Sequence, residues 1–325
     1  MTKDRLAVKI ISLGEILWDV FPDAEYLGGA PFNFAAHARR LGHDVFFVSA
    51  VGDDHRGQSA LAKMEQLDLS TRFVQRLTSG ATGIVSVSLD PAGQPTFTIH
   101  RPAAYDLVSL GPGELAELSS PEADWIYFGT LHQMSPGARD LLSALINANP
   151  RARRFYDINL RPDCYEPALV RDLMKRASVV KLNDAEVRAV EDLFRPSDSS
   201  TGSPHSPRTA RSPSSLEEFC RTGAEAHGWE AVCVTRGAQG CALLIGEEYA
   251  EVGGYPVEVA DTVGSGDAFA AAFVHGLSGR WTSGWTPTEI GDFANRVGAL
   301  VASRHGAIPS WTIQECRALV RVGSR

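Results

Sequence analysis

Apolar, β-branched segments alternate with helix-forming segments along most of the chain. Because neighbouring parallel strands need long crossover connections, such alternation predicts a mostly parallel sheet with helices on both faces. We therefore expect an α/β fold of three layers, with a central sheet between two layers of helices. The segments with the composition of buried strands are residues 7–13, 45–51, 125–128, 155–160, 178–183 and 231–235.

Two segments depart from this alternation. Residues 82–89 and 95–100 alternate polar and apolar side chains around a turn at 90–93, which predicts a hairpin with one face in water. A hairpin between βα units suggests a flap, so we expect a small β lid built from residues of about 15–32 and 82–106. Residues 196–215 are dominated by serine and proline and are expected to be a disordered insertion. Residues 1–325 are otherwise expected to form a single domain.

The overall composition excludes several classes of function. The chain has 325 residues and a formal net charge of −8, without the basic cluster that a nucleic-acid-binding surface needs. No apolar run approaches the length that spans a membrane. Its five cysteines are scattered and show no metal-ligand spacing, which favours free thiols in a reducing cytoplasm. We expect a cytoplasmic protein that binds neither nucleic acid nor membrane.

The most informative stretch is Asp261-Thr262-Val263-Gly264-Ser265-Gly266-Asp267, which leads into a run of helix-forming residues. Its two glycines suit a tight turn, and the first amides of the following helix have no partner inside it. These amides and the helix dipole form a positive socket suited to a phosphate. Asp267 is either an ordinary helix cap or a base that removes a proton from a hydroxyl attacking phosphorus.

A second glycine-rich stretch, residues 27–37, follows the first predicted strand. Asn33 falls in its first helical turns and Asp19 precedes it, so the two side chains could converge on one polar ligand above the carboxyl end of that strand. Further polar residues occupy the same position after other predicted strands. They are Asn159, Arg161, Asn183, Glu186 and Thr235.

With these motifs in place, the chain resembles the ribokinase-like family of carbohydrate kinases, and it looks closest to the fructokinases. Two motifs carry the resemblance: Gly28-Gly29-Ala30-Pro31-Phe32-Asn33 near the start and the stretch ending in Asp267. Within the family, the segments 101–106 and 157–162 are most similar to those of the fructokinases. The family more often has Ala where Ser265 stands, a change that leaves the backbone amide in place. There is no Walker A motif, so a kinase of this sequence is not of the P-loop type.

The resemblance implies roles position by position. Asp267 matches the catalytic base, and the amides of Gly264, Ser265 and Gly266, with that of Asp267, match the anion hole. Positions matching sugar contacts are Asp19, Gly28, Gly29, Asn33 and Arg161. Positions matching the nucleotide and Mg²⁺ site are Asn183, Glu186 (to Mg²⁺ through water), Thr235, Gly237, Gly240 and Asn295. Positions matching a K⁺ loop are Asp261, Val263, Val301, Arg304, Gly306 and Ser310.

The resemblance thus implies an ATP- and Mg²⁺-dependent kinase that phosphorylates a primary hydroxyl of a sugar, with fructose as the first candidate. Another sugar such as ribose, a sugar acid such as 2-keto-3-deoxygluconate, and a nucleoside remain alternatives. Arg101 or Arg161 would serve a sugar acid, and aromatic side chains such as Trp18 or Phe97 would serve a nucleoside. A non-catalytic binding regulator is the alternative from a different class. An exposed edge of the hairpin favours pairing with a second copy as a homodimer.

Overall fold

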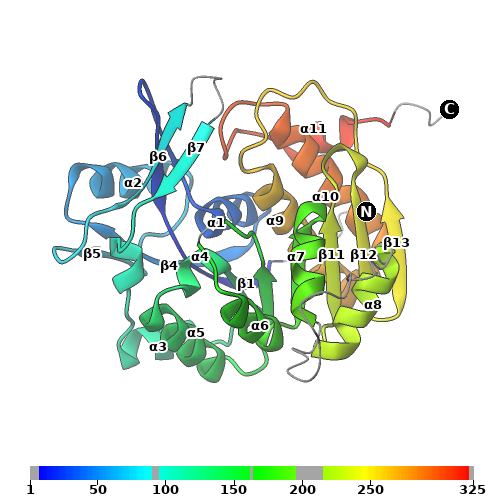
Figure 1. Ribbon diagram of the computed structural model, residues 1–325, viewed down its shortest axis with the longest axis horizontal. Helices are drawn as coiled ribbons and strands as arrows, with labels where there is room; N and C mark the ends of the chain where they lie inside the picture. The colour runs from blue at the N-terminus through cyan, green and yellow to red at the C-terminus, as the bar shows by residue number, and fades with distance from the viewer. Residues whose placement is uncertain (1–6, 90–94, 162–163, 195–214, 322–325) are drawn as a thin grey trace, which may run out of the picture.

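A nine-stranded sheet forms the centre of the molecule (Figure 1). The computed structural model describes residues 7–89, 95–161, 164–194 and 215–321. The strand order is β13-β12-β11-β10-β9-β8-β1-β4-β5, with parallel pairing from β5 through β11 and antiparallel pairing at β12 and β13. The strands are β1 (Lys9–Leu13), β4 (Asp44–Gly52), β5 (Val74–Leu77), β8 (Trp125–Gly129), β9 (Arg153–Asp157), β10 (Val179–Asn183), β11 (Ala231–Thr235), β12 (Cys241–Ile245) and β13 (Glu248–Val252).

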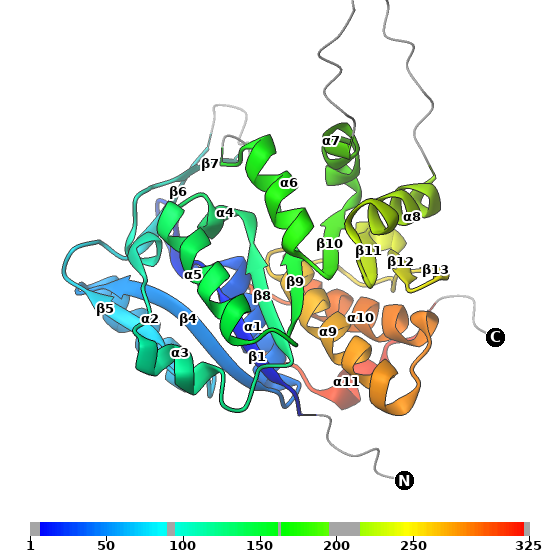
Figure 2. The same ribbon diagram turned by 90° about the horizontal axis from the view of Figure 1, so that it is seen from below.

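Helices cover both faces of this sheet, which confirms the predicted three-layer α/β fold (Figure 2). Buried apolar side chains form one large cluster on each face. The helices that contribute to the first cluster are α1 (Ala30–Arg40), α2 (His55–Gln66), α9 (Ser265–Ser283), α10 (Pro287–Ala302) and α11 (Ile313–Ala318). Those on the other face are α3 (Pro112–Leu118), α5 (Pro136–Ala148), α6 (Pro167–Arg176), α7 (Asp184–Phe194) and α8 (Leu216–His227). Short helices are α4 (Thr130–Gln133), η1 (Ala104–Leu107) and η2 (Gly237–Gln239).

A smaller sheet of four strands lies beside the main sheet, in the order β3-β2-β6-β7. Its strands are β2 (Leu17–Val20), β3 (Glu25–Gly28), β6 (Gly83–Leu89) and β7 (Pro95–Ile99). The chain builds it in two excursions, one between β1 and α1 and one between β5 and η1, and joins them by parallel pairing of β2 with β6. This sheet confirms that a small β lid accompanies the main fold. The hairpin turn at 90–93 lies outside the described residues, as does the predicted insertion 196–215 except for Ser215.

Helix α9 is deeply buried after its first turn. Residues 268–274 are all alanine, phenylalanine or valine and are at most 4% exposed, because the helix packs between the sheet, α1 and α10. A helix that is apolar on all sides belongs in a core. Its amino end therefore has a fixed position relative to the carboxyl ends of the central strands. Among the described residues, no helix is both long and apolar enough to cross a membrane.

Candidate active site

The turn before α9 has the backbone geometry that its glycines predict. Gly264 is the N-cap residue with φ +76°, in the left-handed region that glycine tolerates best. A Cβ at Gly264 would lie 2.3 Å from the carbonyl oxygen of Ala307, so a larger residue would also displace the loop after α10. Position 264 thus requires glycine for two reasons: the left-handed backbone conformation and the close contact with Ala307.

The first turn of α9 presents free backbone donors. Gly264 has no side chain to cap the helix, and the amides of Gly264, Gly266 and Asp267 donate to no acceptor among the described residues. The amide of Ser265 donates to the carbonyl of Thr262 at 3.3 Å, so it is partly engaged in the turn. Three of the four predicted anion-hole donors are therefore open, and they lie beside the Asp267 carboxylate at the positive end of the helix dipole.

Asn33 and Asp267 meet directly, although they are far apart in the sequence. The Nδ2 of Asn33 donates a 2.8 Å hydrogen bond to Oδ2 of Asp267. Asn33 is 3% exposed on α1, which packs against α9, and its Oδ1 is buried without a protein partner. The two glycine motifs of the sequence thus build one site.

The predicted sugar contacts Asp19, Gly28 and Gly29 lie on β2, at the end of β3 and directly before α1. Asp19 lies on β2, and a Cβ at Gly28 would come within 3.2 Å of its Oδ2. Gly29 adopts φ +116° before α1, where a Cβ would lie 2.5 Å from the carbonyl oxygen of Glu15. Both glycines are therefore closely packed, Gly28 against the Asp19 carboxylate and Gly29 against the backbone of Glu15.

Arg161 lies in the loop after β9 and is exposed. Its positive charge lowers the pKa of Asp19 and of Asp267, each of which is raised overall by burial. Arg161 is therefore electrostatically coupled to both carboxylates of the site. Asn159, two residues earlier, has φ +40°, an uncommon conformation for a residue with a side chain, and it turns the chain from the strand toward Arg161.

The pKa of Asp267 is raised from 3.8 to about 6. Burial is the largest cause and the charge of Asp157 is the second, while the Asn33 hydrogen bond, Lys181 and Arg161 lower it. A carboxylate that holds a proton more tightly than usual is a better base near neutral pH. The environment of Asp267 thus suits proton abstraction from an alcohol.

Asn183 and Glu186 cap the start of α7 for each other. The Oδ1 of Asn183 accepts from the amide of Glu186 at 3.0 Å, and Oε2 of Glu186 accepts from the amide of Asn183 at 2.9 Å. The Oε1 of Glu186 also accepts from the amide of Leu160, at 2.6 Å. This carboxylate is 7% exposed and joins the ends of β9 and β10. The Asn-x-x-Glu motif therefore has a structural role as a capping box, and lone pairs of the carboxylate remain for a metal-bound water.

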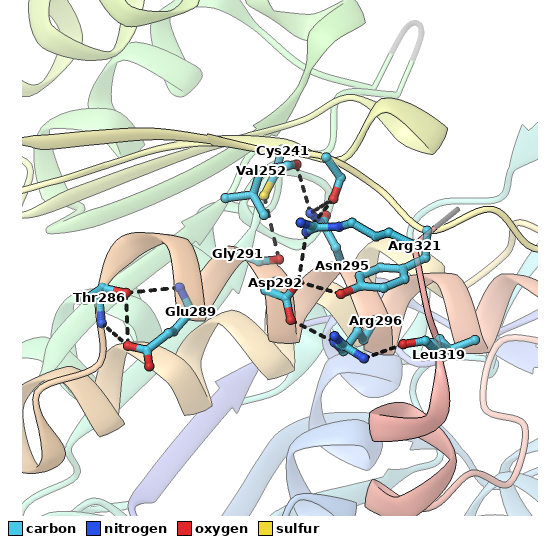
Figure 3. A network of polar contacts seen from close by, with 12 residues as sticks. Cys241, Val252, Thr286, Glu289, Gly291, Asp292, Asn295, Arg296, Leu319 and Arg321 are labelled. Carbon is cyan, nitrogen blue, oxygen red and sulfur yellow. Dashed lines mark hydrogen bonds and ion pairs between the residues drawn. The ribbon is translucent and has the colours of Figure 1, made fainter. Parts of the chain in front are cut away.

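The remaining predicted nucleotide residues lie at the same edge, around β11 to β13. Thr235 ends β11, and Gly237 and Gly240 bracket η2 with φ +53° and +91°. A Cβ at Gly240 would lie 2.0 Å from the carbonyl oxygen of Val252. Asn295 lies on α10, and Figure 3 shows it facing the end of β13, where its Nδ2 donates to the carbonyls of Val252 and Gly253 at 3.0 and 3.1 Å.

The residues that match a potassium loop come from two segments that lie together. The carboxylate of Asp261 accepts from the amide of Val263 at 2.9 Å and from the amide of Gly306 at 3.1 Å. The carbonyl of Val301 accepts from the amide of Arg304 at 3.0 Å, and the Arg304 guanidinium donates to the carbonyl of Ser310. The carbonyl of Ser310 thus already faces a positive charge, so the donor set fits a second cation only in part.

Comparison with known proteins places this geometry in a family. The sequence model described as "pfkB family carbohydrate kinase" matches residues 15–314, which is most of the chain and includes Asp19, Asn33 and Asp267. The chain belongs to the pfkB family of carbohydrate kinases. It is accordingly a sugar kinase, a phosphotransferase that acts on a sugar hydroxyl.

Individual members of the family align over almost the whole chain. A "Fructokinase" of Klebsiella pneumoniae is 29% identical and covers 83% of this chain and 84% of its own. "Putative sugar kinase PH1459" of Pyrococcus horikoshii is 27% identical, with 92% and 91% covered. The fructokinase of Vibrio cholerae O395, solved in a fructose, ADP and calcium ion bound form, superposes with a TM-score of 0.78 at 23% identity and covers 97% of this chain and 99% of its own. This likeness confirms the ribokinase-like fold.

Several residues of this sugar kinase site escaped sequence reasoning. Glu15 is 5% exposed, and burial raises its pKa from 4.5 to about 7. Its Oε2 and the hydroxyl of Tyr105 are buried without a protein partner, as a polar ligand or water would require. Lys181 and Asp157 form a buried ion pair on neighbouring strands. No signal in the sequence shows that side chains inside strands face the site, except that a lysine and an aspartate in apolar strands need partners.

Proposed function

We propose that this sugar kinase uses ATP to phosphorylate the primary hydroxyl of a ketohexose, with fructose as the preferred acceptor. The observation that carries the proposal is the Asp267 carboxylate, hydrogen-bonded to Asn33 at 2.8 Å beside the open first-turn amides of α9. This arrangement holds a base and an anion site side by side, as phosphoryl transfer to an alcohol requires. The fructose and ADP in the related Vibrio fructokinase agree with it.

Asp19 and Asn33 bind hydroxyls of the sugar, and the sugar's primary hydroxyl faces Asp267. As its oxygen bonds to the γ-phosphorus of ATP, the proton passes to Asp267 and the bond from phosphorus to the bridging oxygen of ADP breaks. The amides of Gly266 and Asp267 stabilise the charge on the transferred phosphoryl group. Most of the acceleration comes from positioning and charge stabilisation, because the transition state of phosphoryl transfer is loose.

Glu186 and Asn183 are the residues that would hold Mg²⁺ through water, beside the nucleotide. Mg²⁺ is bound in such sites by one or two carboxylates together with phosphate oxygens and water, which suits a single buried carboxylate at the sheet edge. When bound, the ion neutralises phosphate charge. The K⁺ loop around Asp261 fits its cation in part, and no step of this mechanism uses it.

The charges of the sugar site favour a neutral sugar over a sugar acid. Arg101 is committed to Asp106 by two hydrogen bonds and donates to the carbonyl of Leu131 at 2.7 Å. Asp19 adds a carboxyl group on the lid strand β2, and Glu15 adds a second one, which is charged above its raised pKa of about 7. Of the two cations predicted to serve a sugar acid, only Arg161 is exposed to a ligand, and it faces carboxylates already. A substrate carboxylate would therefore meet repulsion.

A panel of acceptors tests the proposal. The purified enzyme is supplied with ATP and Mg²⁺, and ADP release is measured with fructose, ribose, 2-keto-3-deoxygluconate and adenosine. We expect the highest kcat/KM with fructose, and NMR of the product should show a phosphate on a primary carbon. A higher kcat/KM with the sugar acid than with fructose would contradict the inference that the charges of the site disfavour a substrate carboxylate. Release of ADP with none of the four would contradict the proposed substrate class.

A further inference from the structure

A buried ion pair lies directly beneath the anion site. The Nζ of Lys181 on β10 is 2.9 Å from both carboxylate oxygens of Asp157 on β9, and the two residues are in register on neighbouring parallel strands. Their side chains are 8% and 1% exposed. A Cβ built on Gly266 would lie 3.8 Å from this Nζ, so the ammonium lies below the first turn of α9.

The pair is anchored on its other side by an aromatic residue. The hydroxyl of Tyr127 on β8 donates to Oδ2 of Asp157 at 3.1 Å. The Tyr127 ring stacks on Phe34, the neighbour of Asn33 on α1, with centroids 3.8 Å apart. The Asp157 carboxylate thus accepts three hydrogen bonds from two donor groups, one on each neighbouring strand. Burial is the largest influence on the pKa of Lys181 and lowers it, but the attraction of Asp157, Asp267 and Glu186 together raises the pKa overall, so the lysine stays charged.

Burying such a pair is costly, and packed apolar side chains would serve stability as well or better. The position of the ion pair next to Asp267 suggests a functional reason for keeping it. Asp267 faces charged or titratable groups from four elements and their loops. They are Asp157 from β9, Lys181 from β10, Arg161 from the loop after β9, Glu15 from the turn after β1 and Tyr127 from β8. Asp157 and Lys181 act on Asp267 with opposite sign, Asp157 strengthening its hold on a proton and Lys181 weakening it.

We propose that Lys181 and Asp157 are positioning residues for phosphoryl transfer, which hold the first turn of α9 in place and set the charge around the Asp267 carboxylate. Without Lys181, two carboxylates would face one another and share a proton, as coupled acids do. Without Asp157, an unpaired ammonium would hold Asp267 as a weakly basic anion. The inference rests on the proposed role of Asp267 as the base.

The two partners can be tested separately because they should shift the acid limb of the pH profile in opposite directions. We expect Asp157→Asn to move the acid limb of kcat/KM to lower pH and Lys181→Met to move it to higher pH, each by about one unit, the low end for a neighbouring charge. Both should lower kcat, by up to about 100-fold, the cost of a misplacement of about 1 Å. The KM for ATP should change less. Lys181→Arg should restore the acid limb, and Lys175→Met, an exposed lysine on α6, is the control.

A second readout keeps the inference separate from the proposed substrate. A carbon-13 NMR titration of Asp267 in the sugar-free protein should show the same two opposite shifts in its pKa, whether or not fructose is the acceptor. If Lys181→Met fails to fold, the Asp157→Asn and Lys181→Arg proteins carry the test. Acid limbs that stay in place, or that move in the same direction for Lys181→Met and Asp157→Asn, would show that the pair is structural.

Discussion

Replacing Asp267 by Asn should make the protein more stable and nearly inactive. The folded pKa of about 6 lies above the ordinary value of 3.8, so ionising this carboxyl costs folding free energy. The difference of roughly two units corresponds to about 3 kcal/mol at 1.36 kcal/mol per unit, an upper figure for a partly exposed group. The cost is absent below pH 3.8, grows between 3.8 and about 6, and is complete above that range. Asn removes it, and its Oδ1 still accepts from Asn33.

Thermal melts from pH 4 to pH 8 measure this effect, together with turnover at pH 7.5. The Tm of Asp267→Asn should equal that of the wild type near pH 4 and exceed it by a few degrees at neutral pH. Its kcat should fall by about a thousandfold or more, the upper part of the range for a removed general base. Asp140→Asn, at an exposed position on α5, should change neither. A Tm offset that does not vary with pH would refute the electrostatic reasoning, and near-normal turnover would remove Asp267 from the mechanism.

Three further substitutions probe the surroundings of this residue. Gly264→Ala should reduce both kcat and Tm, because its methyl group would lie 2.3 Å from the carbonyl oxygen of Ala307. The control is Gly284→Ala, which has a similar φ but open space around the new methyl group. It should lower the free energy of unfolding, measured with denaturant, by only about 1–2 kcal/mol. Glu15→Gln should raise Tm above pH 7 but not below pH 4.5, because its raised pKa of about 7 means that ionisation is costly; melts across this range would show it. Asn33→Ala should raise KM for the sugar while leaving KM for ATP nearly unchanged, and it should move the acid limb upward because a hydrogen bond to the charged form is lost. Equal increases in both KM values would make Asn33 structural.

The layers of the fold could be predicted because strands and helices each have a local pattern of apolar residues in the sequence. Strands β8 and β11 lie within one residue of the segments 125–128 and 231–235 that their apolar composition predicts. The contact between Asn33 and Asp267 could be anticipated only from the family resemblance, since it depends on how α1 and α9 pack. The pairing of Asp157 with Lys181 depends on strand order and register, which periodicity does not encode. The mutual capping of Asn183 and Glu186 shows the reverse case, a local motif whose structural use coexists with its predicted functional one.

The two-part construction of the small sheet has a consequence for how the protein folds. Leu17 on β2 pairs with Gly83 on β6, and the intervening chain forms α1, β4, α2 and β5 of the main scaffold. Pairing between strands so distant along the chain is slow, because the ends must first be brought together. We expect the four-stranded sheet to assemble last and to open first, in a local unfolding that leaves the central layers intact. Amide hydrogens of β2 and β6 should then exchange sooner than those of β8 and β9, and mild destabilisation should weaken affinity for the sugar before affinity for the nucleotide.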